Sequence, residues 1–269
     1  MANPKHNPDC LHYDGIRECP LSPSCLDCTN VSVARTHAII ILLGRPGDVL
    51  IASGLIGPLH KQFPNLRLIW LTADESFSLL DGNPQISRLL TPSSDAFSGL
   101  DCEFFDVLIN LDRSHIACSW ATRIPAQSKS GFGLSRHGQI VPLSPSSEIL
   151  FDINRLPGFR GAEKRSWIEI YHNVAGISFD AKDCSPPLLI TAEELIEASN
   201  LRERVLRSGR TRVVCICPGS HKKDLQKRVT PQFFSELVSW LSQDEDLAIC
   251  VLAGPHEEEL YQSLLSESG

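Results

Sequence analysis

The chain has 269 residues, of which 42% are hydrophobic and 21% are charged, and its formal net charge is −7. This length is sufficient for about two domains with cores of their own. The acidic balance argues against nucleic-acid binding, which favours a basic surface. There is no run of about 18 apolar residues to span a membrane. The opening MANPKHNPDC also lacks the apolar region of a secretory signal, so we expect a cytoplasmic protein.

Residues 1–33 are polar, contain several prolines and show neither helical nor strand periodicity. Four cysteines crowd into this extension in the pattern C-x8-C-x5-C-x2-C, namely Cys10, Cys19, Cys25 and Cys28. Closely spaced thiolates are typical of a tetrahedral metal site. We predict a structural metal here, zinc ahead of iron, with disulfides as the alternative that a reducing cytoplasm disfavours. His12 is expected to pack beside the site rather than to serve as a ligand.

Short apolar runs alternate with helix-like segments after the extension. Strands are predicted at 37–43, 66–72, 85–90 and 104–111, helices at 48–63 and 115–124, and a short helix closed by a turn at 74–84. Residues 126–161 are rich in Gly, Pro and Ser and are predicted to be mainly loop, with short strands at 138–143 and 148–153. A helix is expected over 161–177, with Gly176 as its C-cap.

A second alternation follows a helix at 191–206, which Thr191 and Glu194 begin at capping-box spacing. The predicted elements are strands at 211–219 and 247–254 and helices at 230–241 and 255–268. Strands that alternate with helices in both halves indicate an α/β chain with two doubly wound, Rossmann-like lobes. The second lobe is too short to cover a parallel sheet, so we expect it to be incomplete. The expected division is an extension at 1–33, an N-terminal lobe at 34–190, a linker helix at 191–210 and a C-terminal lobe at 211–269.

The stretch GRPGD, residues 44–48, follows the first predicted strand. It fits neither the phosphate loop GxxxxGK[ST] nor the dinucleotide fingerprint GxGxxG, which argues against a nicotinamide-dependent enzyme. Gly44 and Gly47 could simply permit a tight turn, and Asp48 could cap a helix. Alternatively, the Asp48 carboxylate lies at the carboxyl end of the first strand, where open α/β sheets bind ligands, and takes a proton from an attacking hydroxyl.

A similar loop, CPGSHKKDLQKRVTP at 217–231, joins a predicted strand to a helix in the second half. Its Gly219, Ser220 and Lys227 are candidates for phosphate binding through backbone amides and an ammonium group. A solvated basic loop is the alternative. Glu257 falls in the first turn of the last predicted helix, where it either interacts with the helix dipole or accepts hydrogen bonds from a ribose or base.

These segments occur in an order that resembles glycosyltransferase family 9, which includes the ADP-heptose:lipopolysaccharide heptosyltransferases. The resemblance rests on GRPGDVLIASGLIGPLHKQFPNLRLIWLT, DGNPQISRLL, FDVLINLDRS, CPGSHKKDLQKRVTPQFFSELVSWL and VLAGPHEEEL, and it covers roughly residues 36–265. It implies a GT-B fold with the acceptor on the first lobe and the donor on the second. It also implies inverting transfer without a catalytic metal. Asp48 matches the family's catalytic base, Ser220 and Lys227 match the donor-phosphate loop, and Glu257 matches a nucleotide-contacting carboxylate.

The function implied is transfer of a heptose or related sugar from an ADP-sugar donor to a lipopolysaccharide core or related glycan. A lipid-linked acceptor would bring the protein to the cytoplasmic face of the inner membrane without spanning it. Two departures stand out: the family's KRW is here Lys227-Arg228-Val229, and its later D-x-G-x-x-H segment would lie beyond Gly269. The competing expectation is a truncated, inactive member that serves as a binding or interaction module. The N-terminal CLHYDG also matches a cysteine-rich start found in some members, from which no catalytic role follows.

Overall fold

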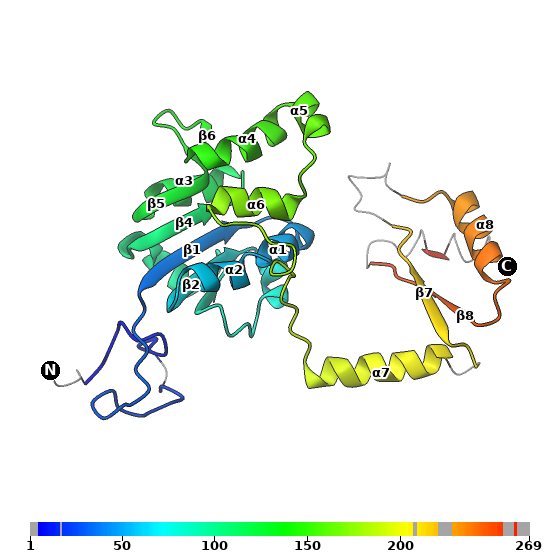
Figure 1. The fold of residues 1–269 in the computed structure, drawn as a ribbon, viewed down its shortest axis with the longest axis horizontal. Helices are drawn as coiled ribbons and strands as arrows, with labels where there is room; N and C mark the ends of the chain where they lie inside the picture. The colour runs from blue at the N-terminus through cyan, green and yellow to red at the C-terminus, as the bar shows by residue number, and fades with distance from the viewer. Residues whose placement is uncertain (1–4, 17, 207–208, 220–227, 255–260, 263–269) are drawn as a thin grey trace. The chain divides into compact units, whose positions relative to one another are not determined.

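The computed structural model describes residues 5–16, 18–206, 209–219, 228–254 and 261–262 (Figure 1). The chain separates into two compact units, Met1–Leu189 and Ile190–Gly269. No helix in the described ranges is both long and apolar enough to cross a bilayer.

The first unit is built on one six-stranded sheet. Its strands are β1 (Thr36–Leu42), β2 (Leu66–Thr72), β3 (Arg88–Leu90), β4 (Phe105–Asn110), β5 (Ala126–Leu134) and β6 (Ile140–Pro142). Their order is β3-β2-β1-β4-β5-β6, in which β6 alone pairs antiparallel with its neighbour. The carboxyl ends of β1 and β4 therefore lie side by side at one edge of the sheet.

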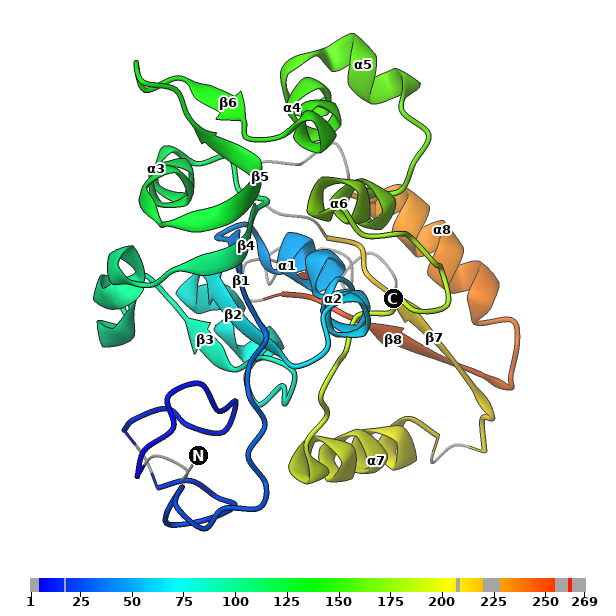
Figure 2. The ribbon, with the colours of Figure 1, turned by 60° about the vertical axis from the view of Figure 1, so that its left-hand side comes forward.

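Helices cover both faces of this sheet. They are α1 (Pro46–Ser53), α2 (Ile56–Gln62), α3 (His115–Arg123), α4 (Glu148–Arg155), α5 (Pro157–Ala162) and α6 (Trp167–Ala175), with 3-10 turns η1 (Asp74–Leu79), η2 (Asp95–Cys102) and η3 (Pro145–Ser147). Alternate residues of β1 enter opposite cores: Ile40 packs with α1, α2, α4 and α6, whereas Ile39 and Ile41 pack with α3. Figure 2 shows α3 on the opposite side of the sheet from α1 and α2.

The apolar runs predicted β1, β2 and β4 well, because most residues of these three strands are buried. The strands predicted at 37–43, 66–72 and 104–111 and the helix at 115–124 are confirmed, and β3 is shorter than predicted. The helix predicted over 74–84 is only the 3-10 turn η1. The C-cap at Gly176 is also confirmed, with a left-handed φ of 69°.

Four other predictions in this unit differ from the structure. The helix predicted over 48–63 is two helices, broken near Gly54, where an added Cβ would come 2.4 Å from the carbonyl oxygen of Cys184. The strand predicted at 148–153 is helix α4, which turns Leu150 and Ile153 into the core. The loop-rich segment contains the nine-residue strand β5, and the helix predicted over 161–177 begins at Trp167 after Ser166 as N-cap.

The second unit contains α7 (Ala192–Leu206), β7 (Arg212–Ile216), α8 (Pro231–Leu241) and β8 (Leu247–Val251). β7 and β8 pair in parallel, and Ile216 and Phe234 form the centre of its small core. The Thr191–Glu194 capping contacts are present as predicted, and the helix predicted at 230–241 is α8 with Thr230 as its N-cap. The helix predicted over 255–268 lies almost wholly outside the described residues.

Candidate active site

Asp48 lies in the first turn of α1, just beyond the carboxyl end of β1. Its backbone N–H donates to the carbonyl of Arg45 at 2.9 Å, and Arg45 is the N-cap. The capping role considered for Asp48 is therefore wrong. The Asp48 side chain is exposed, and within the part of the chain that the structure describes its carboxylate has no hydrogen-bond or ion-pair partner. Asp48 thus presents a free acceptor.

Of the two glycines of GRPGD, Gly44 lies close to this carboxylate, whereas no atom lies within 4 Å of a Cβ added at Gly47. Neither Gly44 nor Gly47 is among the positive-φ glycines of the described chain. An added Cβ at Gly44 would lie 3.5 Å from Asp48 Oδ2 and 3.3 Å from Leu42 Cδ1. A side chain at Gly44 would therefore crowd the face that the Asp48 carboxylate needs.

A second carboxylate, Asp112, follows β4 and organises the loops of this edge. Its Oδ2 accepts the N–H of Leu43 at 2.9 Å, and its Oδ1 accepts the N–H of Ser114 at 2.6 Å. The buried Asn110 in turn accepts the N–H of Asp112 at 3.0 Å and donates to the carbonyl of Phe132 at 2.7 Å. This chain of bonds joins the ends of β1, β4 and β5. Each Asp112 oxygen accepts a backbone amide, which fixes this carboxylate in the loop, whereas the Asp48 carboxylate is exposed.

A pocket of about 280 Å³ opens beside Asp48. Its lining combines polar groups with aromatic rings: Leu42, Gly44, Asp48, Leu111, Asp112, Arg113, Phe132, Leu150, Asn154, Trp167 and Tyr171. Arg113 donates from Nη1 to the carbonyl of Asn154 at 2.8 Å, which places its guanidinium at the pocket. The rings of Trp167 and Tyr171, one turn apart on α6, have centroids 6.1 Å apart.

Burial and negative charge keep two groups near this pocket in their neutral forms. Burial raises the pKa of the Tyr171 phenol, and the charges of Asp48 and Asp112 raise it further. Burial, with a smaller effect of Asp112, raises the pKa of the Cys118 thiol to about 11. The Tyr171 hydroxyl therefore stays a hydrogen-bond donor well into the alkaline range, whereas Cys118 is unsuited to act as a nucleophile.

The set of groups suits a polyhydroxylated ligand. A free carboxylate can accept a hydroxyl proton, and a guanidinium and a phenol can orient neighbouring oxygens. Aromatic rings supply flat apolar area beside these polar groups, as in most small-molecule sites. The site lies at the carboxyl ends of the strands, where open α/β sheets bind their ligands.

The donor residues predicted in the second unit are described only in part. Gly219 is half-buried beyond the carboxyl end of β7, whereas Ser220, Lys227 and Glu257 lie outside the described residues. The N–H of Val229 donates to the carbonyl of Pro218 at 3.1 Å, so the loop returns to its starting point before α8 begins. The donor site stays a prediction.

The four predicted metal ligands lie around the same small cavity. Cys10, Cys19, Cys25 and Cys28 all line a single small cavity, and all four are free thiols. Among the residues described, no group of three His, Cys, Asp or Glu side chains is yet arranged to hold a metal ion.

Sequence reasoning assigned no role to Asp112, Arg113, Trp167 or Tyr171. Asp112 and Arg113 carried a detectable signal, because NLDR directly follows a buried strand and so falls at the same edge as Asp48. Trp167 and Tyr171 gave no such sequence signal, because only the tertiary packing of α6 places them at the pocket.

Comparison with solved structures identifies the fold. A glycosyltransferase of family 9 from Veillonella parvula matches with a TM-score of 0.63 and 15% identity, over 89% of this chain and 69% of that one. An ADP-heptose LPS heptosyltransferase II from E. coli matches with a TM-score of 0.56 and 16% identity, over 86% of this chain and 68% of that one. No protein-family profile and no curated protein matches the sequence. The predicted GT-B-like α/β fold class is confirmed.

Proposed function

We propose that this chain is a glycosyltransferase related to family 9, which moves a heptose or related sugar from an ADP-sugar to a glycan acceptor. The observation that carries the proposal is the unpaired Asp48 carboxylate beside a polar and aromatic pocket. The likeness in fold to glycosyltransferases supports it. The donor and the acceptor are proposed from the site residues, because structures with 15–16% sequence identity share the fold alone.

In the proposed reaction, the acceptor sugar occupies the pocket with one hydroxyl at Asp48. The carboxylate takes the hydroxyl proton as the oxygen attacks the anomeric carbon of the donor, and the bond to the nucleoside diphosphate breaks. Attack from the side opposite the leaving group inverts the anomeric centre. Arg113 and Tyr171 orient the acceptor, and Trp167 offers its apolar face to the sugar ring.

The leaving diphosphate would be bound by the second unit. Gly219, Ser220 and Lys227 are the proposed ligands, since backbone amides and an ammonium group stabilise charge that develops on phosphate oxygens. Glu257 would contact the nucleoside. No catalytic metal is invoked. A lipopolysaccharide core or a related lipid-linked glycan is the proposed acceptor, met at the cytoplasmic face of the inner membrane.

Thermal-shift titration of the purified chain tests the donor assignment. A ligand that binds only the folded state raises the melting temperature by an amount set by its concentration relative to its Kd. ADP and ADP-heptose should raise it, and UDP-glucose and NAD should not. No rise with any nucleotide would favour the competing function, a binding module without transferase activity, and the largest rise with NAD would overturn the donor class.

A further inference from the structure

The cysteine-rich extension before β1 is held closed by its own backbone. Cys10 and Val33 form an antiparallel bridge. Beside this bridge, the N–H of Leu11 donates to the backbone carbonyl of Ser32 at 2.8 Å, and the N–H of Ala34 donates to the backbone carbonyl of Asp9 at 2.7 Å. In its described part, from residue 5 to residue 35 without residue 17, the extension has no helix and no strand.

The four thiols of this loop surround one cavity of about 10 Å³. Such a volume corresponds to about one water-sized sphere. Cys10 is buried and the other three are half-buried, and none is in a disulfide. The rest of the lining contains no carboxylate, lysine or arginine: His12, Tyr13, Leu21, Ser22, Ser24, Asn30 and Val31. A soft, thiol-rich lining without competing charges suits a thiophilic metal ion.

We propose that Cys10, Cys19, Cys25 and Cys28 bind one structural Zn²⁺ as a tetrathiolate site. Each thiol gives up its proton to solvent as its sulfur binds the metal, and no electrons are exchanged. The thiols are not yet grouped as ligands in the described structure, so binding turns them inward from the cavity wall that they share. The bound ion then stabilises the extension, which is too short to form a hydrophobic core of its own.

A local turn prepares one pair of these ligands. Ser22 Oγ donates to the carbonyl of Ser24 at 2.8 Å, and the N–H of Leu26 donates to Ser24 Oγ at 3.2 Å. These contacts bend the chain immediately around Cys25, the first residue of the C-x2-C pair. The turn therefore contains the C-x2-C pair, Cys25 and Cys28, whose spacing lets two thiolates bind one ion.

The closed segment is fastened to the amino-terminal edge of the sheet. Arg67, near the start of β2, donates from Nη2 to the carbonyls of Cys10 at 2.5 Å and Pro8 at 3.1 Å. Its positive charge also lies beside a ligand of a site that becomes negatively charged when four thiolates bind Zn²⁺. Arg67 thus serves as both the anchor and the counter-charge of the zinc site.

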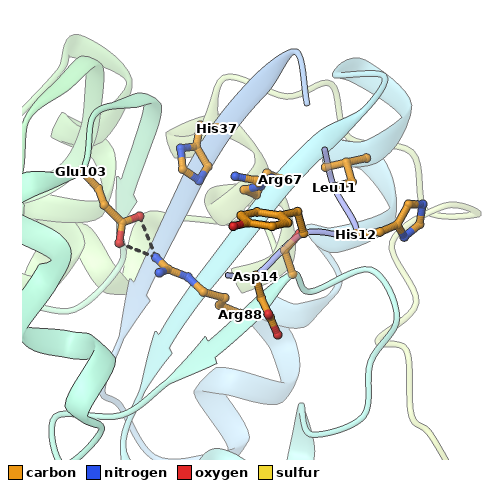
Figure 3. Close-up of a pocket in the computed structure, with 9 residues that line it drawn as sticks. Leu11, His12, Asp14, His37, Arg67, Arg88 and Glu103 are labelled. Atoms are coloured by element: carbon orange, nitrogen blue, oxygen red, sulfur yellow. Dashed lines mark hydrogen bonds and ion pairs between the residues drawn. The ribbon is translucent and has the colours of Figure 1, made fainter. Parts of the chain in front are cut away.

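A second contact surrounds this anchor. Leu11, His12, Tyr13 and Asp14 form one wall of a pocket of about 250 Å³ whose other walls are His37, Arg67, Ser87, Arg88 and Glu103 (Figure 3). Arg88 and Glu103 pair across it at 2.6 Å. This edge holds the amino ends of β1, β2 and β3, whereas Asp48 follows the carboxyl end of β1. The zinc site is therefore structural, and it is independent of the proposed transferase function.

Metal analysis of the reduced full chain tests the site. We expect about one zinc per chain in the wild type and none in the double variant Cys25→Ser/Cys28→Ser. The matched control Cys102→Ser/Cys184→Ser removes two thiols outside the cavity and should keep the zinc. Replacement by Co²⁺ should give the intense visible bands of tetrahedral coordination and thiolate-to-cobalt charge transfer in the near ultraviolet. Absence of metal, equal loss in both double variants, an iron–sulfur spectrum or disulfides among the four cysteines would each overturn the proposal.

Hydrogen exchange tests the anchor separately. The amides of Leu11 and Ala34 should exchange faster after zinc is removed by a chelator. Arg67→Ala should also speed their exchange while zinc content stays near one, and Arg136→Ala, an exposed arginine between β5 and β6, should change neither quantity. If Arg67→Ala leaves exchange at the wild-type rate, Arg67 is not the anchor.

Discussion

The Asp112 carboxylate accepts the backbone N–H of Leu43 at 2.9 Å and thereby ties the end of β4 to the loop that presents Asp48. At the other end of β1, Asp106 Oδ2 accepts the N–H of His37 at 2.7 Å. The two aspartates thus make the same kind of contact at opposite edges of the sheet. Only Asp112 contacts the loops around the candidate site.

This pair separates stability from function. Asp106→Ala leaves the amide of His37 without its acceptor and should lower the free energy of unfolding by about 1–3 kcal/mol, and Asp112→Ala, which leaves the amides of Leu43 and Ser114 without theirs, should lower it by at least as much. Asp112→Ala should in addition reduce kcat for sugar transfer at least tenfold, because the loop carrying Asp48 loses its position. Urea unfolding and steady-state kinetics give the two quantities. Equal kcat values in the two variants would show that Asp112 does not position the site.

The close approach of β4 and β5 depends on Gly131. Its φ is 87°, and an added Cβ would stand 1.7 Å from the carbonyl oxygen of Asn110. Gly131→Ala should therefore cost more than the roughly 1–3 kcal/mol of a strained backbone alone. Gly138 is the control, since its φ of 81° is similar but no atom lies within 4 Å of an added Cβ. In chemical unfolding, Gly138→Ala should lower the free energy of unfolding only by the cost of the strained backbone, about 1–3 kcal/mol. Equal losses would mean that the contact with Asn110 relaxes freely.

The buried thiol of Cys118 gives a prediction at alkaline pH. Burial raises its pKa from 9.0 to about 11, so the unfolded chain ionises this thiol first. The stability that it contributes is present below pH 9 and is lost as pH rises through 11. At pH 11, wild-type stability relative to Cys118→Ala should have fallen by about 2 kcal/mol, since one pKa unit corresponds to about 1.4 kcal/mol. Cys102→Ala, which removes an exposed thiol, should parallel the wild type in unfolding curves measured from pH 7 to 11. A constant difference between wild type and Cys118→Ala would contradict the assignment.

Trp167 should matter to the acceptor more than to the fold. It is half-buried at the start of α6, and its ring pairs with Tyr171. Trp167→Ala should raise the acceptor KM roughly tenfold and cost about 0.5–1.5 kcal/mol of stability, the usual value of an aromatic pair. Trp167→Phe should restore most of both. Trp240→Ala, an exposed tryptophan on α8, should leave the acceptor KM unchanged in the same assay. An unchanged KM for Trp167→Ala would remove this residue from the acceptor site.

Sequence reasoning succeeded where burial on both faces makes an element apolar, as in β1, β2 and β4. It missed β5, whose sequence AQSKSGFGL has few apolar residues and owes its strand form to pairing with β4 and β6. It assigned EILFDI to a strand because six residues with apolar Ile149, Phe151 and Ile153 fit a period of two as well as a helix. The close approach of Cys184 to Gly54, where α1 ends, comes from a segment far along the chain and is contained in no local pattern.

The site followed the same division. Asp48 could be placed because a strand–loop–helix pattern sets its position at the sheet edge. Asp112 acts by binding the amide of Leu43, and Tyr171 reaches the pocket because α6 packs beside it. Both contacts are set by tertiary structure, so no local sequence pattern predicts them.

The central claim is tested most directly by measuring sugar transfer by Asp48→Asn. With ADP-heptose and a heptose-deficient lipopolysaccharide core as substrates, kcat should fall at least about a hundredfold, the usual contribution of a general base. The rise in melting temperature with ADP should be unchanged. Asp101→Asn, a substitution of an exposed aspartate on η2, should transfer at the wild-type rate. Turnover by Asp48→Asn at the wild-type rate would contradict the account, because the unpaired carboxylate would then not be the base.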